Sequence, residues 1–179
     1  TGHPGGPPTR VGASVGDLTA GLFTTIGISS ALHYRAESGK GMKIDVAMLD
    51  CQVAILENAL SRYFLSGKSP APLGARHPSI APFAAYKTYD GNIIIACGTD
   101  ALYRKFCAAI ERPALIDDPR FVTNDKRSDN VDALTAEIES ALAVHGTSHW
   151  LALLEGLGVP CAPINDIAAI ANDPHIAAR

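Results

Sequence analysis

The sequence contains no closely spaced pair of cysteines. Its four cysteines stand far apart in apolar neighbourhoods, and none forms the C-x-x-C pattern typical of zinc sites and redox disulfides. They are Cys51, Cys97, Cys107 and Cys161. We therefore expect reduced, buried thiols in a cytoplasmic protein, and no metal bound by cysteine.

Basic charge is also scarce. The chain has 15 Lys and Arg residues against 18 Asp and Glu residues, for a net charge of −3. A surface that binds nucleic acid needs a field of Lys and Arg to neutralise phosphates, so nucleic acid is not an expected partner. The longest apolar runs, such as residues 93–97, are far shorter than the ~20 residues that span a bilayer. We expect no membrane partner either.

Apolar residues are plentiful, at 47% of 179 residues against 18% charged. That composition is enough for one sizeable core or two small ones. The chain starts at Thr1 without an initiator Met, and its first eight residues are rich in Gly and Pro with no signal-peptide core. We expect a piece of a longer protein.

The first third of the chain predicts a helix, a short strand and a second helix. Apolar residues recur at helical spacing from Asp17 to Ala36, beside several glycines and serines, so we expect a buried helix that packs closely against its neighbours. Gly39 and Gly41 end this helix. Residues 43–46 alternate like a strand, and helical periodicity resumes over residues 49–65.

A proline-rich segment follows and is predicted to be a linker over residues 69–82. Beyond it we expect a small α+β domain over residues 83–179. Asp90-Gly91 separates two β-rich runs and predicts a hairpin, because both residues tolerate positive φ. The other expected elements are helices over residues 100–110, 131–144, 149–157 and 167–171, and an extended segment over residues 158–164.

Asp17 follows Gly16 at the start of the first predicted helix. Free N–H groups and the positive end of the helix dipole stabilise a carboxylate there, so by physics alone Asp17 is a helix N-cap. The preceding stretch, residues 12–16, lacks the G-x-G-x-x-G spacing and is followed by no Gly-Lys-Ser/Thr. A nucleotide-binding loop of those kinds is therefore excluded.

Three histidines are candidates for binding a metal or a substrate. His145 and His149 are four residues apart, but Gly146 and Thr147 break the helix between them, so we expect no shared metal-binding face. His77 lies in a loop beside Arg76, a combination that suits a carboxylate ligand. The alternative for His77 is a solvated loop tip.

Several motifs, taken together in their order and spacing, resemble the family III, or CaiB/BaiF, CoA-transferases. They are GPPTRVG at 6–12, GDLTAG at 16–21, Gly27 to Leu32, SGKG at 38–41, IDVAMLD at 44–50, RHPSIAPF at 76–83, DDPRF at 117–121, GVPCAPIN at 158–165 and Asp173-Pro174. No single motif is specific. The later ones are most similar to formyl-CoA transferase relatives and to the succinate–hydroxymethylglutarate CoA-transferase type.

The resemblance implies an α/β fold in which residues 1–68 are the central part of a large domain. Asp17 falls on the family's nucleophilic aspartate. Met48 falls where the family has a methionine near bound CoA, with a core methionine as the alternative. The segment from Gly74 through Arg76 to His77 falls on a glycine-rich loop that covers the intermediate, although it holds only one glycine.

The implied activity is transfer of CoA between carboxylic acids through an aspartyl anhydride and an aspartyl-CoA thioester. Coenzyme A and acyl-CoA would be substrates, with no prosthetic group, and the full-length protein would be an interlocked homodimer. One alternative is an isomerase similar to α-methylacyl-CoA racemase, whose partner histidine would lie before Thr1. Another is a non-catalytic piece for CoA binding or subunit association.

Overall fold

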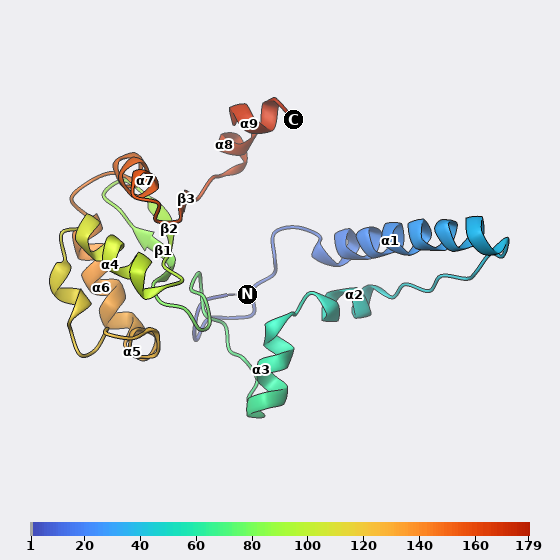
Figure 1. Cartoon of the computed structure of the whole chain (residues 1–179), viewed down its shortest axis with the longest axis horizontal. Helices are drawn as coiled ribbons and strands as arrows, with labels where there is room; N and C mark the ends of the chain where they lie inside the picture. The colour runs from blue at the N-terminus through green and yellow to red at the C-terminus, as the bar shows by residue number, and fades with distance from the viewer. Residues whose placement is uncertain (1) are drawn as a thin grey trace. The chain divides into compact units, whose positions relative to one another are not determined.

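The computed structural model describes residues 2–179, and the chain divides into two compact units between Gly74 and Ala75. The first unit is helical and the second contains the β-sheet (Figure 1). The division falls within the proline-rich segment, where few side chains can form a continuous core.

Three helices form the regular structure of the first unit. They are α1 (Val15–Ser38), α2 (Met48–Ala54) and α3 (Asn58–Ser66). α1 ends at Gly39, as the sequence predicted. α1 and α2 pack against each other, so the chain folds back between them.

The strand predicted over residues 43–46 is not present. Residues 40–47 have no regular secondary structure, and the segment from Ile44 to Ala47 lines a cavity together with α1. A strand requires backbone hydrogen bonds from a neighbouring strand, and the sheet of this chain lies in the other unit. The alternation of Ile44 and Val46 therefore reflects packing near a helix, and the prediction of a helix-strand-helix order is wrong for this chain.

The single helix predicted over residues 49–65 is also wrong, because the structure has two helices there. Between α2 and α3, Glu57 adopts φ +50°, a left-handed conformation that is uncommon for residues other than glycine. The apolar periodicity continues across this break. The sequence pattern therefore could not reveal it.

No residue of α1 is buried within this chain, contrary to the prediction of a buried helix. Leu18, Leu22 and Ile26 are 59%, 66% and 60% exposed. By length and composition alone α1 could cross a membrane, although core helices of soluble proteins meet the same criterion. An apolar helix this exposed requires a covering surface to be stable in water.

The second unit is built on a three-stranded antiparallel sheet in the order β1-β2-β3. β1 (Phe83–Lys87) and β2 (Asn92–Ala96) form the predicted hairpin, with Phe83 opposite Ala96. The predicted extended segment contributes β3 (Cys161–Pro163), which pairs with β2. β3 is an edge strand, where proline is tolerated because one side needs no ladder hydrogen bonds.

Six α-helices and one 3₁₀ helix follow or connect the strands in this unit. They are α4 (Asp100–Ala109), α5 (Asn124–Asp129), α6 (Val131–Leu142), α7 (Thr147–Gly156), α8 (Ile167–Ala171) and α9 (Pro174–Ala177), with a 3₁₀ helix, η1 (Pro113–Ile116). The sequence predicted α4, α6, α7 and α8, and the Thr99 hydroxyl caps α4 by accepting the N–H of Leu102. It missed α5, α9 and η1, which have at most six residues and are too short to show a period.

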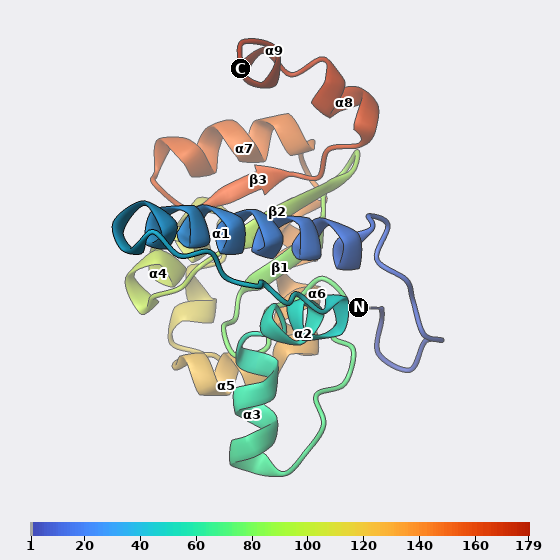
Figure 2. The ribbon, with the colours of Figure 1, turned by 90° about the vertical axis from the view of Figure 1, so that its right-hand side faces the viewer.

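The core of the second unit lies between the sheet and helices α4, α6 and α7. Ile93 and Ile95 alternate along β2 and are fully buried, as are Phe106 from α4 and Ile138 from α6. α7 runs along β3 and completes this layer (Figure 2). The second unit therefore contains its own hydrophobic core.

The hairpin turn is held by side-chain hydrogen bonds rather than by positive φ. Neither Asp90 nor Gly91 has positive φ. Instead, Asp90 Oδ1 accepts the backbone N–H of Thr147 at 2.7 Å and the Thr147 hydroxyl at 3.0 Å. These hydrogen bonds from Thr147 hold the pKa of Asp90 below its usual value. They also tie the turn to the start of α7.

Two of the cysteines are predicted to be inert in the folded chain. Burial raises the pKa of Cys97 to about 12 and that of Cys107 to about 11, and only the thiolate reacts readily. We expect iodoacetamide at pH 8 to leave both unmodified in buffer and to modify both in guanidinium chloride, as measured by peptide mass mapping. Rapid labelling of either residue without denaturant would contradict the burial.

Candidate active site

Asp17 lies in the first turn of α1 rather than at its N-cap. The helix starts at Val15, and Ser14 occupies the N-cap without a side-chain capping hydrogen bond. The predicted N-cap role of Asp17 is therefore wrong, although its carboxylate still lies at the positive end of the helix. Asp17 is exposed, and its carboxylate has no hydrogen-bond or ion-pair partner among residues 2–179.

Backbone donors are free beside this carboxylate. Val15 N–H donates to Ala13 O, and Leu18 N–H donates to Ser14 O. The N–H groups of Gly16 and Asp17 have no acceptor within the described part of the chain. Such orphan donors at a helix start are suited to stabilising an oxyanion.

α2 brings Met48 toward the same turn. Met48 is the first residue of α2 and is 48% exposed. One helical turn further on, the amide Nε2 of Gln52 donates to the Met48 carbonyl at 3.4 Å. The same Nε2 lies 3.2 Å from the position that a Cβ on Gly16 would take. The turns that carry Asp17 and Met48 are therefore connected through Gln52.

Sequence reasoning missed Gln52. One exposed glutamine on a helix carries no pattern of its own, and glutamine is common on helix surfaces. The available signal was spacing, since Gln52 stands four residues after Met48 and therefore on the same helix face. That spacing does not indicate which residue of another helix the side chain meets.

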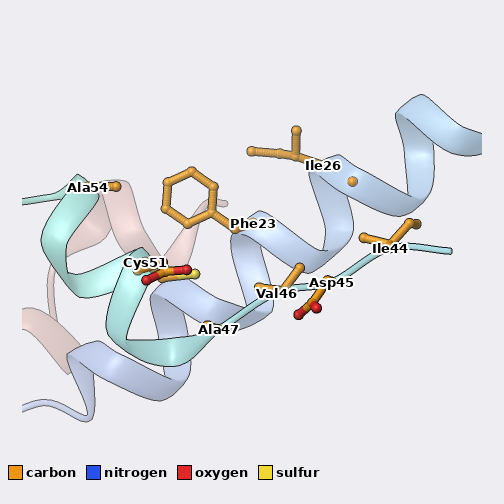
Figure 3. Close-up of a pocket in the computed structure, with 10 residues that line it drawn as sticks. Phe23, Ile26, Ile44, Asp45, Val46, Ala47, Cys51 and Ala54 are labelled. Carbon is orange, nitrogen blue, oxygen red and sulfur yellow. The ribbon is translucent and has the colours of Figure 1, made fainter.

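A cavity of about 410 Å³ lies between α1 and the following segment (Figure 3). Its lining residues are Phe23, Ile26, Gly27, Ile44, Asp45, Val46, Ala47, Asp50, Cys51 and Ala54. The lining is mostly apolar, and its only charges are the two carboxylates. Negative charge disfavours a carboxylate ligand, so this cavity suits an uncharged apolar group.

The predicted substrate loop spans the division between the units. Gly74 ends the first unit with φ +65°, and its N–H donates to Gly2 O at 2.9 Å. In the second unit, Arg76 is half-buried. The ring of His77 stacks on Phe83 with centroids 5.1 Å apart, and its Nδ1 accepts the N–H of Ser79. His77 is therefore held in place and is not a solvated loop tip.

The hydrogen bond to Nδ1 determines which ring nitrogen of a neutral His77 carries the proton. Because Nδ1 accepts a hydrogen bond from a backbone N–H, a neutral imidazole carries its proton on Nε2. His77 thus offers a donor, and Arg76 offers a guanidinium. Both groups can bind a carboxylate.

α5 fixes the segment that follows this loop. Asn124 accepts the N–H of Ala81 and donates to the carbonyl of Ser79. Arg127 is 1% exposed and donates from Nε to Ala81 O at 2.6 Å and from Nη2 to Asp100 at 2.7 Å. These hydrogen bonds tie residues 79–81 to the core of the second unit.

The two spaced histidines meet, although a helix begins between them. α7 starts at Thr147, yet the rings of His145 and His149 have centroids 4.0 Å apart and both lie edge-on to Trp150. The helix break predicted between them is present, and the two rings meet across it. Among residues 2–179 there is no group of three or more His, Cys, Asp or Glu side chains placed to hold a metal ion.

Comparison with known proteins decides the family. The profile of CoA-transferase family III matches residues 1–179. The chain belongs to CoA-transferase family III. The family resemblance carried by the sequence motifs is therefore confirmed.

Among curated family III proteins, the chain is 47% identical over 180 residues to acetyl-CoA:oxalate CoA-transferase of Acetobacter aceti, covering 100% of the chain and 46% of that protein. It is 38% identical to succinyl-CoA:mesaconate CoA-transferase of Haloarcula hispanica, covering 98% of the chain and 44% of that protein. A crystal structure of a CaiB/BaiF family protein from Brucella suis matches with 41% identity and a TM-score of 0.82, over 100% of this chain and 47% of that one. The chain thus spans under half the length of these relatives.

Proposed function

We propose that this chain is the central segment of a CoA-transferase and carries its nucleophile, Asp17. The observation that supports this role is the exposed carboxylate of Asp17, which has no partner among the described residues and lies beside the free N–H groups of Gly16 and Asp17. A nucleophile needs an available lone pair, and acyl transfer needs donors where negative charge develops. Asp17 combines both at the start of α1.

In the proposed reaction, an Asp17 carboxylate oxygen attacks the thioester carbonyl carbon of the donor acyl-CoA. The carbon–sulfur bond breaks, which leaves a mixed anhydride on Asp17 and a CoA thiolate. The thiolate attacks the aspartyl carbonyl carbon, and the bond from that carbon to the bridging oxygen breaks. The donor acid leaves as a carboxylate, and Asp17 holds CoA as a thioester.

The acceptor acid then reverses this sequence. Its carboxylate attacks the aspartyl-CoA carbonyl carbon and expels the thiolate, which forms a second anhydride. The thiolate attacks the acceptor acyl carbonyl, so that the new acyl-CoA is released and Asp17 regains its carboxylate. Coenzyme A and the acids are substrates in this scheme, and no prosthetic group takes part.

The remaining candidate residues receive binding roles. Met48 would contact bound CoA, because Gln52 links its turn to that of Asp17. Arg76 and the Nε2–H of His77 would bind the substrate carboxylate. The loop that begins at Gly74 would cover the anhydride and exclude water, which otherwise hydrolyses it. The full-length protein would act as a homodimer.

We infer that the acceptor is a short dicarboxylic acid. The names of two similar relatives include oxalate and mesaconate, which carry two carboxylates. One carboxylate has to react with the intermediate on Asp17, so the second is free to be bound. Arg76 and His77, neighbours in the sequence, offer a guanidinium and an imidazole N–H that can bind a carboxylate.

Trapping the intermediate tests the proposed function. The full-length protein is incubated with succinyl-CoA or oxalyl-CoA, quenched with hydroxylamine and mapped by peptide mass spectrometry. We expect a hydroxamate on Asp17 that is absent from Asp17→Ala. If no adduct forms and the α-protons of succinyl-CoA exchange with deuterated solvent, the racemase-like alternative holds. If neither occurs, the chain is the non-catalytic piece.

A further inference from the structure

Gln52 has a hydrogen-bonding group that its own contacts do not use. The amide nitrogen carries two N–H donors, and one of them donates to the Met48 carbonyl at 3.4 Å. The other has no acceptor among residues 2–179. Gln52 is exposed, and its amide lies against the first turn of α1.

The close approach depends on glycine at position 16. A Cβ there would lie 3.2 Å from Gln52 Nε2 and 3.3 Å from its Cδ, which is tighter than ordinary van der Waals contact. Any larger residue at Gly16 would push the amide away from α1. The glycine therefore leaves room for a polar group one residue from the nucleophile.

The free donor lies one residue along the chain from Asp17. Gln52 Nε2 lies 3.2 Å from the position that a Cβ on Gly16 would take, and the Cα atoms of Gly16 and Asp17 are about 3.8 Å apart. Gln52 and Asp17 share no hydrogen bond in the structure. Catalytic hydrogen bonds often align only in the complex with substrate, so this arrangement is compatible with such a role.

We infer that Gln52 is an oxyanion donor for acyl exchange at Asp17, an inference that rests on the proposed function. When thiolate attacks the aspartyl carbonyl carbon, the carbonyl oxygen gains a full negative charge. The Gln52 N–H donates to that oxygen, alongside the free N–H groups at the start of α1. When the tetrahedral intermediate collapses, the charge leaves with the departing carboxylate and the hydrogen bond weakens.

The test is Gln52→Met in the full-length protein, since methionine keeps the length and volume of the side chain but has no N–H donor. We expect kcat to fall on the order of 10- to 100-fold, because removing one oxyanion donor commonly has an effect of this size or larger. KM for acyl-CoA should stay within about twofold, because the donor acts in the transition state. Rapid quenching should show slower formation of aspartyl-CoA.

Two further variants keep the inference falsifiable. Gln52→Leu has a similar volume, lacks the donors and adds no charge, so it should show the same loss if Gln52→Met folds poorly. Asn58→Ala is the matched control, because it removes an exposed amide from the next helix, and it should retain full activity. A kcat unchanged in both Gln52 variants would overturn the inference. A lower melting temperature together with a higher KM for acyl-CoA, at unchanged kcat, would also overturn it. That result would show that Gln52 acts only through packing.

These outcomes are separable from failure of the proposed function. If Asp17→Asn still forms the adduct, the nucleophile is elsewhere and both proposals fail. If Asp17→Asn forms no adduct while Gln52→Met turns over normally, only the role of Gln52 is wrong.

Discussion

Asp17→Asn in the full-length protein is expected to lower kcat for CoA transfer by on the order of 10⁴-fold or more, as removal of a nucleophile does in other covalent enzymes. The asparagine amide cannot form the anhydride, because its nitrogen lone pair is delocalised and its oxygen carries no full charge. KM for acyl-CoA should change little, since the two side chains have nearly the same shape. The measurement is steady-state transfer of CoA between two acids, followed by separation of the acyl-CoA products.

Asp132→Asn is the matched control for this change. Asp132 is an exposed aspartate in the first turn of α6, so the control removes the same charge from the first turn of another helix. It should keep wild-type kcat. Equal activity of Asp17→Asn and the wild type would show that the carboxylate is dispensable and would exclude covalent catalysis through it.

Arg127→Met is expected to lower the free energy of unfolding of the second unit by about 3 kcal/mol or more. Arg127 donates to Ala81 O, to Phe121 O and to Asp100, and its guanidinium lies 4.2 Å from the centre of the Tyr103 ring. Methionine fills similar space but leaves two buried carbonyls without donors, at about 1–3 kcal/mol each. Asp100 contributes less, because its side chain is 58% exposed.

Urea unfolding of the 179-residue chain, followed by fluorescence of its single tryptophan, Trp150, measures this effect in the second unit. Arg104→Met is the control, because Arg104 is an exposed cation on α4, and its substitution should change stability by no more than about 0.5 kcal/mol. If both variants unfold at the same urea concentration, the buried network is not a source of stability.

The sequence predicted those elements whose signals are local. The hairpin follows from two β-rich runs at a fixed separation, and α4 follows from a capping threonine before a periodic run. The strand over residues 43–46 was wrong because alternation shows only which side chains face inward. Whether a strand or a helix lies opposite depends on residues far away in the sequence, and here that neighbour is α1.

In the candidate site, too, the sequence revealed the local feature and missed the contact between distant residues. The sequence alone placed Asp17 at a helix start but gave it only a capping role, and its proposed role as nucleophile comes from the family resemblance. Neither the sequence pattern nor the family resemblance pointed to Gln52. Its relation to Gly16 joins two helices and depends on an absent Cβ, a contact that appears only when α1 and α2 are placed in space.

The uneven burial of the two units bears on how such a protein assembles. Apart from Cys51, the buried apolar residues of the described chain all belong to the second unit. That unit can therefore collapse around its own residues as soon as they are all synthesised. Helix α1 gains little from the rest of this chain, and an isolated helix has only marginal stability. We therefore expect the segment that bears the proposed nucleophile, Asp17, to be ordered last, so that a competent site forms only after the surrounding structure is complete.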